Sequence, residues 1–182
     1  MLKKLRRISS RTLHENPWWS YRQDRYLRPD DTEGDYFYIK TPGSVAIMAE
    51  LPNGKFLLLK QFRYLNQTES LEFIGGGMKP GHSPEDSARE EMLEEAGLTA
   101  DELIPIGKFN PMNGATDELC FVFLARGLHQ DTPKPEQTEE FERVELSMEE
   151  LERLIGNGTL WDGMTLATLS LYRSYLLASK KL

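Results

Sequence analysis

Residues 75–98 read GGGMKPGHSPEDSAREEMLEEAGL, a glycine-rich stretch that runs directly into a helix with defined ends. Ser83 is a favourable N-cap, Pro84 fits the first helical position, and Gly97 suits the left-handed conformation that ends a helix. An apolar stripe lies at helical spacing on Ala88, Met92 and Ala96. The segment therefore predicts a loop followed by a helix that packs one face on a core.

Three carboxylates lie on one side of that helix: Glu91, Glu94 and Glu95. At about 100° per residue, positions i, i+3 and i+4 span roughly a quarter of the helix circumference, where like charges repel. An acidic helix face is usually only solvated, and this is the alternative for an isolated Glu-x-x-Glu-Glu. Directly after a glycine loop, which lets a ligand approach the backbone, the cluster instead indicates a hard cation such as Mg²⁺.

The segment resembles the Nudix box, whose pattern is Gly-x5-Glu-x7-Arg-Glu-U-x-Glu-Glu-x-Gly-U, with U an aliphatic residue. Gly76 aligns with the first glycine and Glu91 with the glutamate after the arginine. Glu94 and Glu95 align with the paired glutamates without a gap, and Gly97 closes the motif.

Two positions depart from this pattern. His82 stands where the box has its first glutamate, and Glu90 stands where it has arginine. In the family these two positions chiefly brace the loop against the helix and orient a catalytic glutamate. Because acid and base have changed places, we expect a His82–Glu90 contact to replace the usual pairing.

Composition is that of a globular protein of one main domain, with 182 residues, 39% hydrophobic and 28% charged. The net charge of −7 argues against nonspecific binding to nucleic acid or to an anionic membrane. The single cysteine, Cys120, lies in an apolar run and is expected to be a buried small hydrophobe. A cytoplasmic location is expected, because the basic N-terminus lacks a signal-peptide core and no run could span a bilayer.

Around the box, apolar runs alternate with turn signals. Strands are expected over residues 18–27, 35–40, 44–51, 55–62, 70–74, 103–109, 118–125 and 143–146, and further helices over 148–155 and 162–179. Asn53-Gly54 between two apolar runs predicts a hairpin. Residues 1–16 are expected to be a poorly ordered or short arm, and residues 130–140 a loop.

These elements predict an α/β (α+β) fold. The family resemblance implies an α/β/α sandwich with a mixed central sheet, plus a small N-terminal antiparallel sheet. We expect residues 1–43 to form an N-terminal arm and strands used for dimerisation, and residues 44–182 to form the Nudix hydrolase domain.

Four segments outside the box are similar to the branch of the family that hydrolyses ADP-ribose and other nucleoside diphosphate sugars. They are residues 16–19 (NPWW), 60–76 (KQFRY to LEFIGG), 111–118 (PMNGATDE) and 158–165 (GTLWDGMT). Each is weak alone, and their order along the chain makes the resemblance, which covers roughly residues 16–175. The third segment lacks the Ser-Pro-Gly of the corresponding loop in that branch.

The resemblance implies a set of metal and catalytic residues. Mg²⁺, or Mn²⁺ in its place, would be bound by the carbonyl of Gly75 and by Glu91 and Glu95, with Glu94 completing the catalytic cluster through a water or a second ion. The general base would come from a late acidic loop, making Glu140 or Glu139 the candidate; the alternative is that this run is only solvated loop.

Substrate-binding residues are expected outside the helix, with Gly76 and Glu118 among them. Arg63 would bind phosphate or sugar hydroxyls, or else serve only as a surface salt-bridge partner. Trp18 and Trp19 would point to opposite faces of a strand, one in the core and the other stacked on a nucleobase or in a dimer contact.

The expected activity is Mg²⁺-dependent hydrolysis of the diphosphate bond in nucleoside diphosphate sugars by a homodimer. One alternative within the enzyme class is a Nudix pyrophosphatase for another nucleoside polyphosphate. An alternative outside the enzyme class is a Nudix module that binds a nucleotide sugar without cleaving it. Only the altered His82 and Glu90 support this alternative.

Overall fold

The computed structural model describes residues 3–132 and 140–179. In chain order its elements are β1 (Arg6–Glu15), β2 (Ser20–Leu27), β3 (Glu33–Lys40), β4 (Ser44–Glu50), β5 (Phe56–Arg63), β6 (Thr68–Glu72), β7 (Ile74–Gly77), α1 (Pro84–Ala96), β8 (Leu98–Phe109), β9 (Cys120–Gln130), β10 (Glu142–Leu146), α2 (Met148–Gly156) and α3 (Gly163–Ser179). Helices and strands are thus mixed along the chain, as the sequence predicts.

The chain forms two compact units. The smaller comprises Met1–Gly43 and Asn110–Leu119, and the larger comprises Ser44–Phe109 and Cys120–Leu182. Residues 110–119 join the smaller unit because they bond to β3, where the amide of Ile39 donates to Ala115 O at 2.9 Å. Sequence analysis assigned these ten residues to the 44–182 domain, because nothing local in them signals pairing with β3.

The larger unit is built on a mixed sheet with strand order β10-β5-β4-β9-β8, to which β6 adds beside β5 and β7 beside β4. Strand β4 is parallel to β9 and antiparallel to β5 and β7. The Asn53-Gly54 turn between β4 and β5 is present as predicted, with Gly54 at φ 76°. Cys120 is buried at the start of β9, also as expected.

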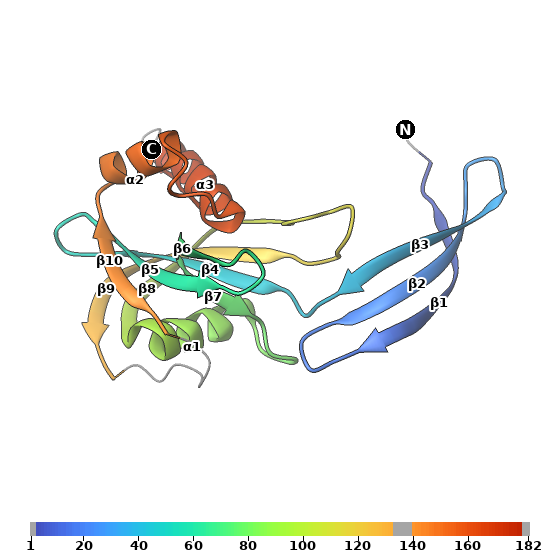
Figure 1. Cartoon of the computed structure of the whole chain (residues 1–182), viewed down its shortest axis with the longest axis horizontal. Helices are drawn as coiled ribbons and strands as arrows, with labels where there is room; N and C mark the ends of the chain where they lie inside the picture. The colour runs from blue at the N-terminus through green and yellow to red at the C-terminus, as the bar shows by residue number, and fades with distance from the viewer. Residues whose placement is uncertain (1–2, 133–139, 180–182) are drawn as a thin grey trace. The chain divides into compact units, whose positions relative to one another are not determined.

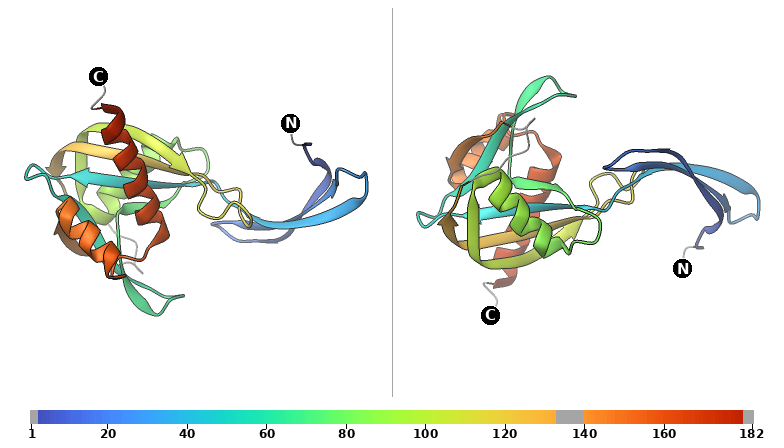
Figure 2. Two further views of the ribbon diagram at one scale, coloured as in Figure 1. Left: turned by 90° about the horizontal axis from the view of Figure 1, so that it is seen from above. Right: turned by 90° about the horizontal axis from the view of Figure 1, so that it is seen from below.

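Helices cover both faces of this sheet (Figures 1 and 2). Val45 and Ile47 of β4 pack with Ala88, Met92 and Ala96 of α1. Met48 points to the other face, where it packs with Leu151 of α2 and Leu169 of α3. Because successive residues of one strand serve opposite cores, β4 is apolar along nearly its whole length. The predicted α/β/α sandwich is confirmed.

Residues after α1 extend further as strands than predicted. Strand β8 begins at Leu98 rather than residue 103, and it pairs with β9 as far as Gln130. The predicted strand over residues 70–74 is instead two strands, β6 on β5 and β7 on β4, divided at Phe73. That division matters for the site, because it turns the glycines away from β5 and onto β4.

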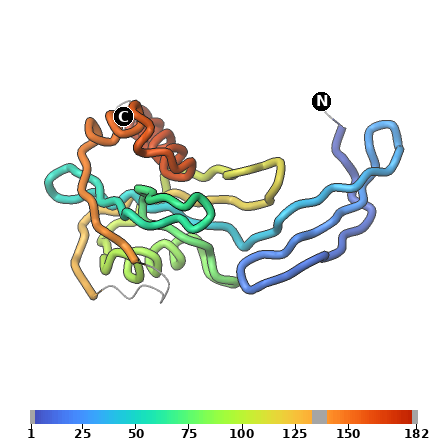
Figure 3. The backbone as a smooth tube through the Cα atoms, viewed as in Figure 1, coloured from blue at the N-terminus to red at the C-terminus, as the bar shows by residue number. Residues whose placement is uncertain are grey.

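Strands β1, β2 and β3 form a small antiparallel sheet whose course is easily followed in Figure 3. The expectation of a poorly ordered or short arm over residues 1–16 is wrong, because Arg6–Glu15 pairs with Ser20–Leu27. All ten residues of β1 are exposed. A strand that buries no face carries no apolar alternation, so its backbone pairing with β2 leaves little trace in the sequence.

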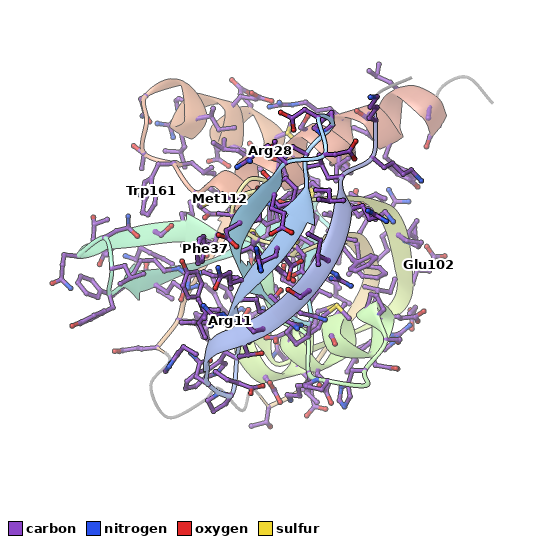
Figure 4. The ribbon with its side chains drawn as sticks, turned by 90° about the vertical axis from the view of Figure 1, so that its right-hand side faces the viewer. Arg11, Arg28, Phe37, Glu102, Met112 and Trp161 are labelled. Atoms are coloured by element: carbon purple, nitrogen blue, oxygen red, sulfur yellow. The ribbon has the colours of Figure 1, made fainter. Side chains whose placement is uncertain are left out.

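The start of α3 is fixed to the β5–β6 hairpin. The indole of Trp161 donates to Glu69 O at 3.4 Å, and Trp161 lies beside this hairpin in Figure 4. Asp162 caps the helix by accepting from the amide of Thr165 at 2.7 Å. Both contacts belong to the larger unit and bring the first turn of α3 to the edge of the candidate site.

Candidate active site

Helix α1 begins and ends where its sequence predicts. The Ser83 hydroxyl accepts from the amide of Asp86 at 3.1 Å, and Pro84 starts the helix. Gly97 adopts the left-handed conformation, at φ 57°, and its amide bonds to Leu93 O. Because both ends are capped, the glutamates between them have fixed positions around the helix axis.

One row of glutamates faces the glycine strand β7. Glu95 is only 8% exposed, and its Oε2 accepts from the amide of Gly75 at 3.0 Å. The carboxylate of Glu91 lies against Gly76, where an added Cβ would meet Glu91 Oε1 at 2.5 Å. The glycines therefore let two carboxylates, one helical turn apart, lie directly against strand backbone.

The second row, Glu90 and Glu94, faces the loop that precedes the helix. The ammonium of Lys79 lies 3.2 Å from Glu90 Oε2 and 3.4 Å from Glu94 Oε1. His82 Nδ1 lies 3.2 Å from the same Glu90 oxygen, so the predicted His82–Glu90 contact is present. The hydrogen bond to Glu90 raises the pKa of Lys79, and Glu94 adds to the effect.

The donors on the first row fit a hard divalent cation. Carboxylate oxygens such as those of Glu91 and Glu95 are the ligand type that Mg²⁺ or Mn²⁺ prefers. Within residues 3–132 and 140–179, no three acidic, histidine or cysteine side chains are gathered closely enough to hold an ion by themselves. The remaining ligands would come from the backbone, from water or from the substrate, as is usual for Mg²⁺.

A cavity of about 140 Å³ adjoins the glycine strand. It is lined by Ser44, Val45, Ala46, Arg63, Glu72, Phe73, Gly75, Gly76, Asp162, Met164, Thr165 and Thr168. Three of the predicted site residues, Arg63, Gly75 and Gly76, thus line one cavity. The space suits a sugar or a phosphate group rather than a whole dinucleotide-sized ligand.

Arg63 is held in this cavity by Glu72. Its Nε donates to Glu72 Oε1 at 2.7 Å, and a second guanidinium nitrogen contacts the other carboxylate oxygen. Glu72 is only 7% exposed. The pair raises the pKa of Arg63, with Asp162 and Glu95 adding negative charge nearby. Arg63 is therefore not a free surface cation, and its guanidinium is pre-positioned at the cavity.

Hydroxyl groups of α3 also line the cavity. Thr165 Oγ1 accepts from the amide of Phe73 at 3.3 Å, which ties α3 to the residue between β6 and β7. Thr168 is fully buried, and its Oγ1 has no hydrogen-bond partner in the described part of the chain. The cavity thus combines a guanidinium, carboxylates and hydroxyls, a set that can bind both phosphate and sugar oxygens.

The other predicted residues are placed less directly. Glu139 lies outside the described residues. Glu140 is exposed and comes just before β10, in which Glu142 pairs with Lys60, three residues before Arg63. Trp18, Trp19 and Glu118 belong to the smaller unit, so their part in the site stays a prediction.

The expectation that one tryptophan is buried in a strand is wrong. Trp18 is 72% exposed and Trp19 is 37% exposed. Both amides bond to the side chain of Asn16 at 2.9 Å, in a turn before β2. An Asn side chain followed by proline favours such a turn over a strand, which was the signal available in the sequence.

Sequence reasoning missed three residues of the site: Lys79, Glu72 and Thr168. Lys79 stands at a position where the box pattern accepts any residue, so the motif gives it no weight. Glu72 lies in the segment similar to the sugar-nucleotide branch, where an acid among the otherwise apolar residues 71–74 was a usable signal. Thr168 reaches the cavity through the packing of α3, which no local pattern specifies.

Comparison with known proteins agrees with this geometry. The NUDIX domain model matches residues 40–168. The chain is 34% identical over 129 residues to ADP-ribose pyrophosphatase of Bacillus subtilis (strain 168), covering 70% of each chain. It is 27% identical over 180 residues to GDP-mannose pyrophosphatase of Yersinia enterocolitica, covering 91% of this chain and 93% of that protein.

A solved structure titled "Crystal structure of ADP compounds hydrolase" shares the fold, with a TM-score of 0.85. The match covers 100% of this chain and 99% of that one at 17% identity. Fold, box and sequence similarity therefore agree that the chain belongs to the Nudix family, in its ADP-ribose pyrophosphatase branch.

Proposed function

We propose that this protein hydrolyses the diphosphate bond of nucleoside diphosphate sugars of the ADP-ribose and GDP-mannose type. The products would be a nucleoside monophosphate and a sugar phosphate. The observation that carries the proposal is the placement of Glu91 and Glu95 against Gly75 and Gly76, on a strand that also lines the Arg63 cavity. Carboxylates for a cation and a guanidinium for a phosphate thus meet at one strand. The names of the relatives support the substrate class.

A divalent cation, which we propose to be Mg²⁺, would withdraw charge from the diphosphate oxygens and favour ionisation of the attacking water. Glu91 and Glu95 would hold it, with the carbonyl of Gly75 and with Glu94 contributing as the family resemblance implies. Arg63, already oriented by Glu72, would bind a phosphate oxygen or a sugar hydroxyl of the substrate.

Hydrolysis needs a base to take one proton from water as its oxygen bonds to phosphorus and the bridging P–O bond breaks. We propose Glu140, with Glu139 as the alternative. Glu142 pairs with Lys60, so the chain carrying Glu140 reaches β10 at the end of β5 that bears Arg63. Phe141, which lies between Glu140 and Glu142 in the chain, packs against the core cluster beneath α1. This contact anchors the segment on the α1 side of the sheet.

The test is a substrate panel with Mg²⁺: ADP-ribose, GDP-mannose, UDP-glucose, ATP and a diadenosine polyphosphate. Released phosphomonoester is converted to phosphate by a phosphatase and measured, with E95Q as the blank. Cleavage of sugar nucleotides that E95Q lacks is the expected result. Cleavage of only ATP or the polyphosphate would overturn the substrate class. Tight binding without any turnover would identify a binding module instead.

We further propose that the protein is a homodimer formed through its small sheet, and that it is cytoplasmic. The sheet exposes large apolar side chains on all three strands: Ile8, Leu13, Tyr21, Tyr36, Phe37 and Ile39. Such a surface is unusual for a monomer. No helix within the described residues is both long and apolar enough to cross a membrane.

F37D tests the dimer. Phe37 is 47% exposed and stacks on Tyr21 with ring centroids 6.3 Å apart (Figure 4 labels Phe37). We expect light scattering to give twice the chain mass of 20.9 kDa for the wild type and a single chain mass for F37D. The control is Y64D, a change at another exposed aromatic, on the larger unit. A monomeric wild type, or a dimer that survives F37D, would refute the interface.

A further inference from the structure

Four of the five glutamates of helix α1 form two i,i+4 rows, and the two rows have different partners. Glu91 and Glu95 lie against the glycine strand. Glu90 and Glu94 are joined instead by one cation from the preceding loop, because Lys79 Nζ lies 3.2 Å from the first and 3.4 Å from the second. A lysine that contacts both members of an i,i+4 pair of like charges offsets their repulsion.

The box pattern places a permanent cation at position 90, on the helix itself. This chain places an anion there, which adds a fourth carboxylate beside Glu91 and Glu94. His82 also contacts Glu90, and it is charged only if protonated. Lys79 is the permanent cation that the structure brings to these two glutamates.

We propose that Lys79 is a positioning residue, which fixes the carboxylate of Glu94 and neutralises Glu90 beside the cation-binding row. The proposal rests on the proposed hydrolytic function. Lys79 touches no reacting atom in this assignment, and it acts through Glu94. The loop thus places a positive charge next to the helix. In the box pattern that positive charge is on the helix itself, at position 90.

The expected effect is on turnover more than on folding. The side chains of Lys79, Glu90 and Glu94 are 51%, 39% and 35% exposed, and ion pairs at such exposures contribute little to stability. A misplaced carboxylate next to a metal site, in contrast, typically lowers activity about 10- to 100-fold. Substrate binding through Arg63 involves no contact with Lys79, so KM should change little.

The first experiment compares K79Q, K79R and K55Q on the best sugar nucleotide of the panel. We expect K79Q to lower kcat about 10-fold with KM unchanged, and K79R to retain most of the activity. K55Q is the matched control, because Lys55 makes a similar exposed pair with Glu150, at 3.5 Å, on another helix. Wild-type kcat in K79Q, or equal losses in K79Q and K79R, would overturn the proposal.

The second experiment restores the charges of the box pattern. E90R places an arginine opposite Lys79 and His82, so positive charges repel each other there. We expect kcat to fall. We also expect the melting temperature, measured in EDTA, to fall by about 2–4 °C. H82E/E90R removes one of the two repulsions. K79E/H82E/E90R removes both repulsions, so its kcat and its melting temperature should come closest to those of the wild type. Full recovery already in H82E/E90R would show that Lys79 is not part of the network.

The two proposals fail in different ways. Absence of turnover in the wild type would overturn the proposed function, and the melting series in EDTA, which needs neither metal nor substrate, would then decide the Lys79 network by itself. Normal turnover in the wild type and in K79Q would overturn the role of Lys79 alone.

Discussion

E95Q is expected to lower kcat/KM on sugar nucleotides by at least about 100-fold. Glu95 is 8% exposed and bonds to the amide of Gly75, on the strand that lines the cavity. The amide of glutamine keeps the size of the side chain and one acceptor oxygen, but it lacks the charge that a divalent cation requires. Outer-shell changes at metal sites already cost about 10- to 100-fold, so loss of a ligand should cost at least as much.

The same change should leave folding nearly intact. Removing one negative charge relieves repulsion from Glu91 and Glu94, and it weakens the attraction to Arg63, on which Glu95 acts electrostatically. Since these effects oppose each other, we expect the melting temperature in EDTA to stay within about 3 °C of the wild type. Calorimetric titration with Mg²⁺ should show the loss of affinity directly.

E85Q is the matched control for E95Q. Glu85 lies in the first turn of the same helix and pairs with Arg89 at 2.8 Å. Its carboxylate contacts none of the three glycines of β7 in the described structure, so both activity and Mg²⁺ affinity should be unchanged. Equal losses in E85Q and E95Q would mean that the total charge of the helix, not the row at the glycines, determines activity.

Local features of the fold were predictable from sequence, and nonlocal ones were not. The ends of α1 follow from Ser83, Pro84 and Gly97, because capping involves only residues within one turn. The β4–β5 hairpin follows in the same way from Asn53-Gly54. Strand β1 was missed because its side chains are all exposed and only its partner β2 defines it.

The same distinction between local and nonlocal features applies to the residues of the candidate site. The glutamates of α1 could be assigned because a helix fixes their spacing. The bond between Arg63 and Glu72 could not, because it depends on the register of β5 and β6, where Arg63 pairs with Thr68 and Leu59 with Glu72. The attachment of residues 110–119 to β3 likewise arises from pairing of Ile39 with Thr116, far apart in the chain.

Alanine substitutions at the three successive glycines of β7 should have three different effects. A Cβ at Gly75 would lie 2.3 Å from Val45 O and 3.1 Å from Ala46 Cα, both in the backbone of central strand β4. That strand is buried between two layers and cannot move aside. G75A should therefore destabilise the protein by about 3 kcal/mol, a fall of roughly 6–12 °C in melting temperature.

G76A should instead reduce activity with little loss of stability. Its Cβ would lie 2.5 to 2.8 Å from the carboxylate of Glu91, which is the end of a flexible side chain and can rotate away. Rotation displaces the carboxylate from the strand, so we expect kcat/KM to fall about 10- to 100-fold while the melting temperature changes by less than about 4 °C.

G77A is the control within the same strand, because a Cβ there would meet nothing within 4 Å. None of the three glycines has the left-handed backbone that would strain an alanine, so differences among the variants report on contacts alone. Thermal unfolding and Mg²⁺-dependent turnover, measured together, separate the roles: Gly75 lets β7 approach β4, and Gly76 leaves room for the carboxylate of Glu91. Wild-type turnover in G76A would mean that the position of Glu91 against this strand is not needed for the reaction.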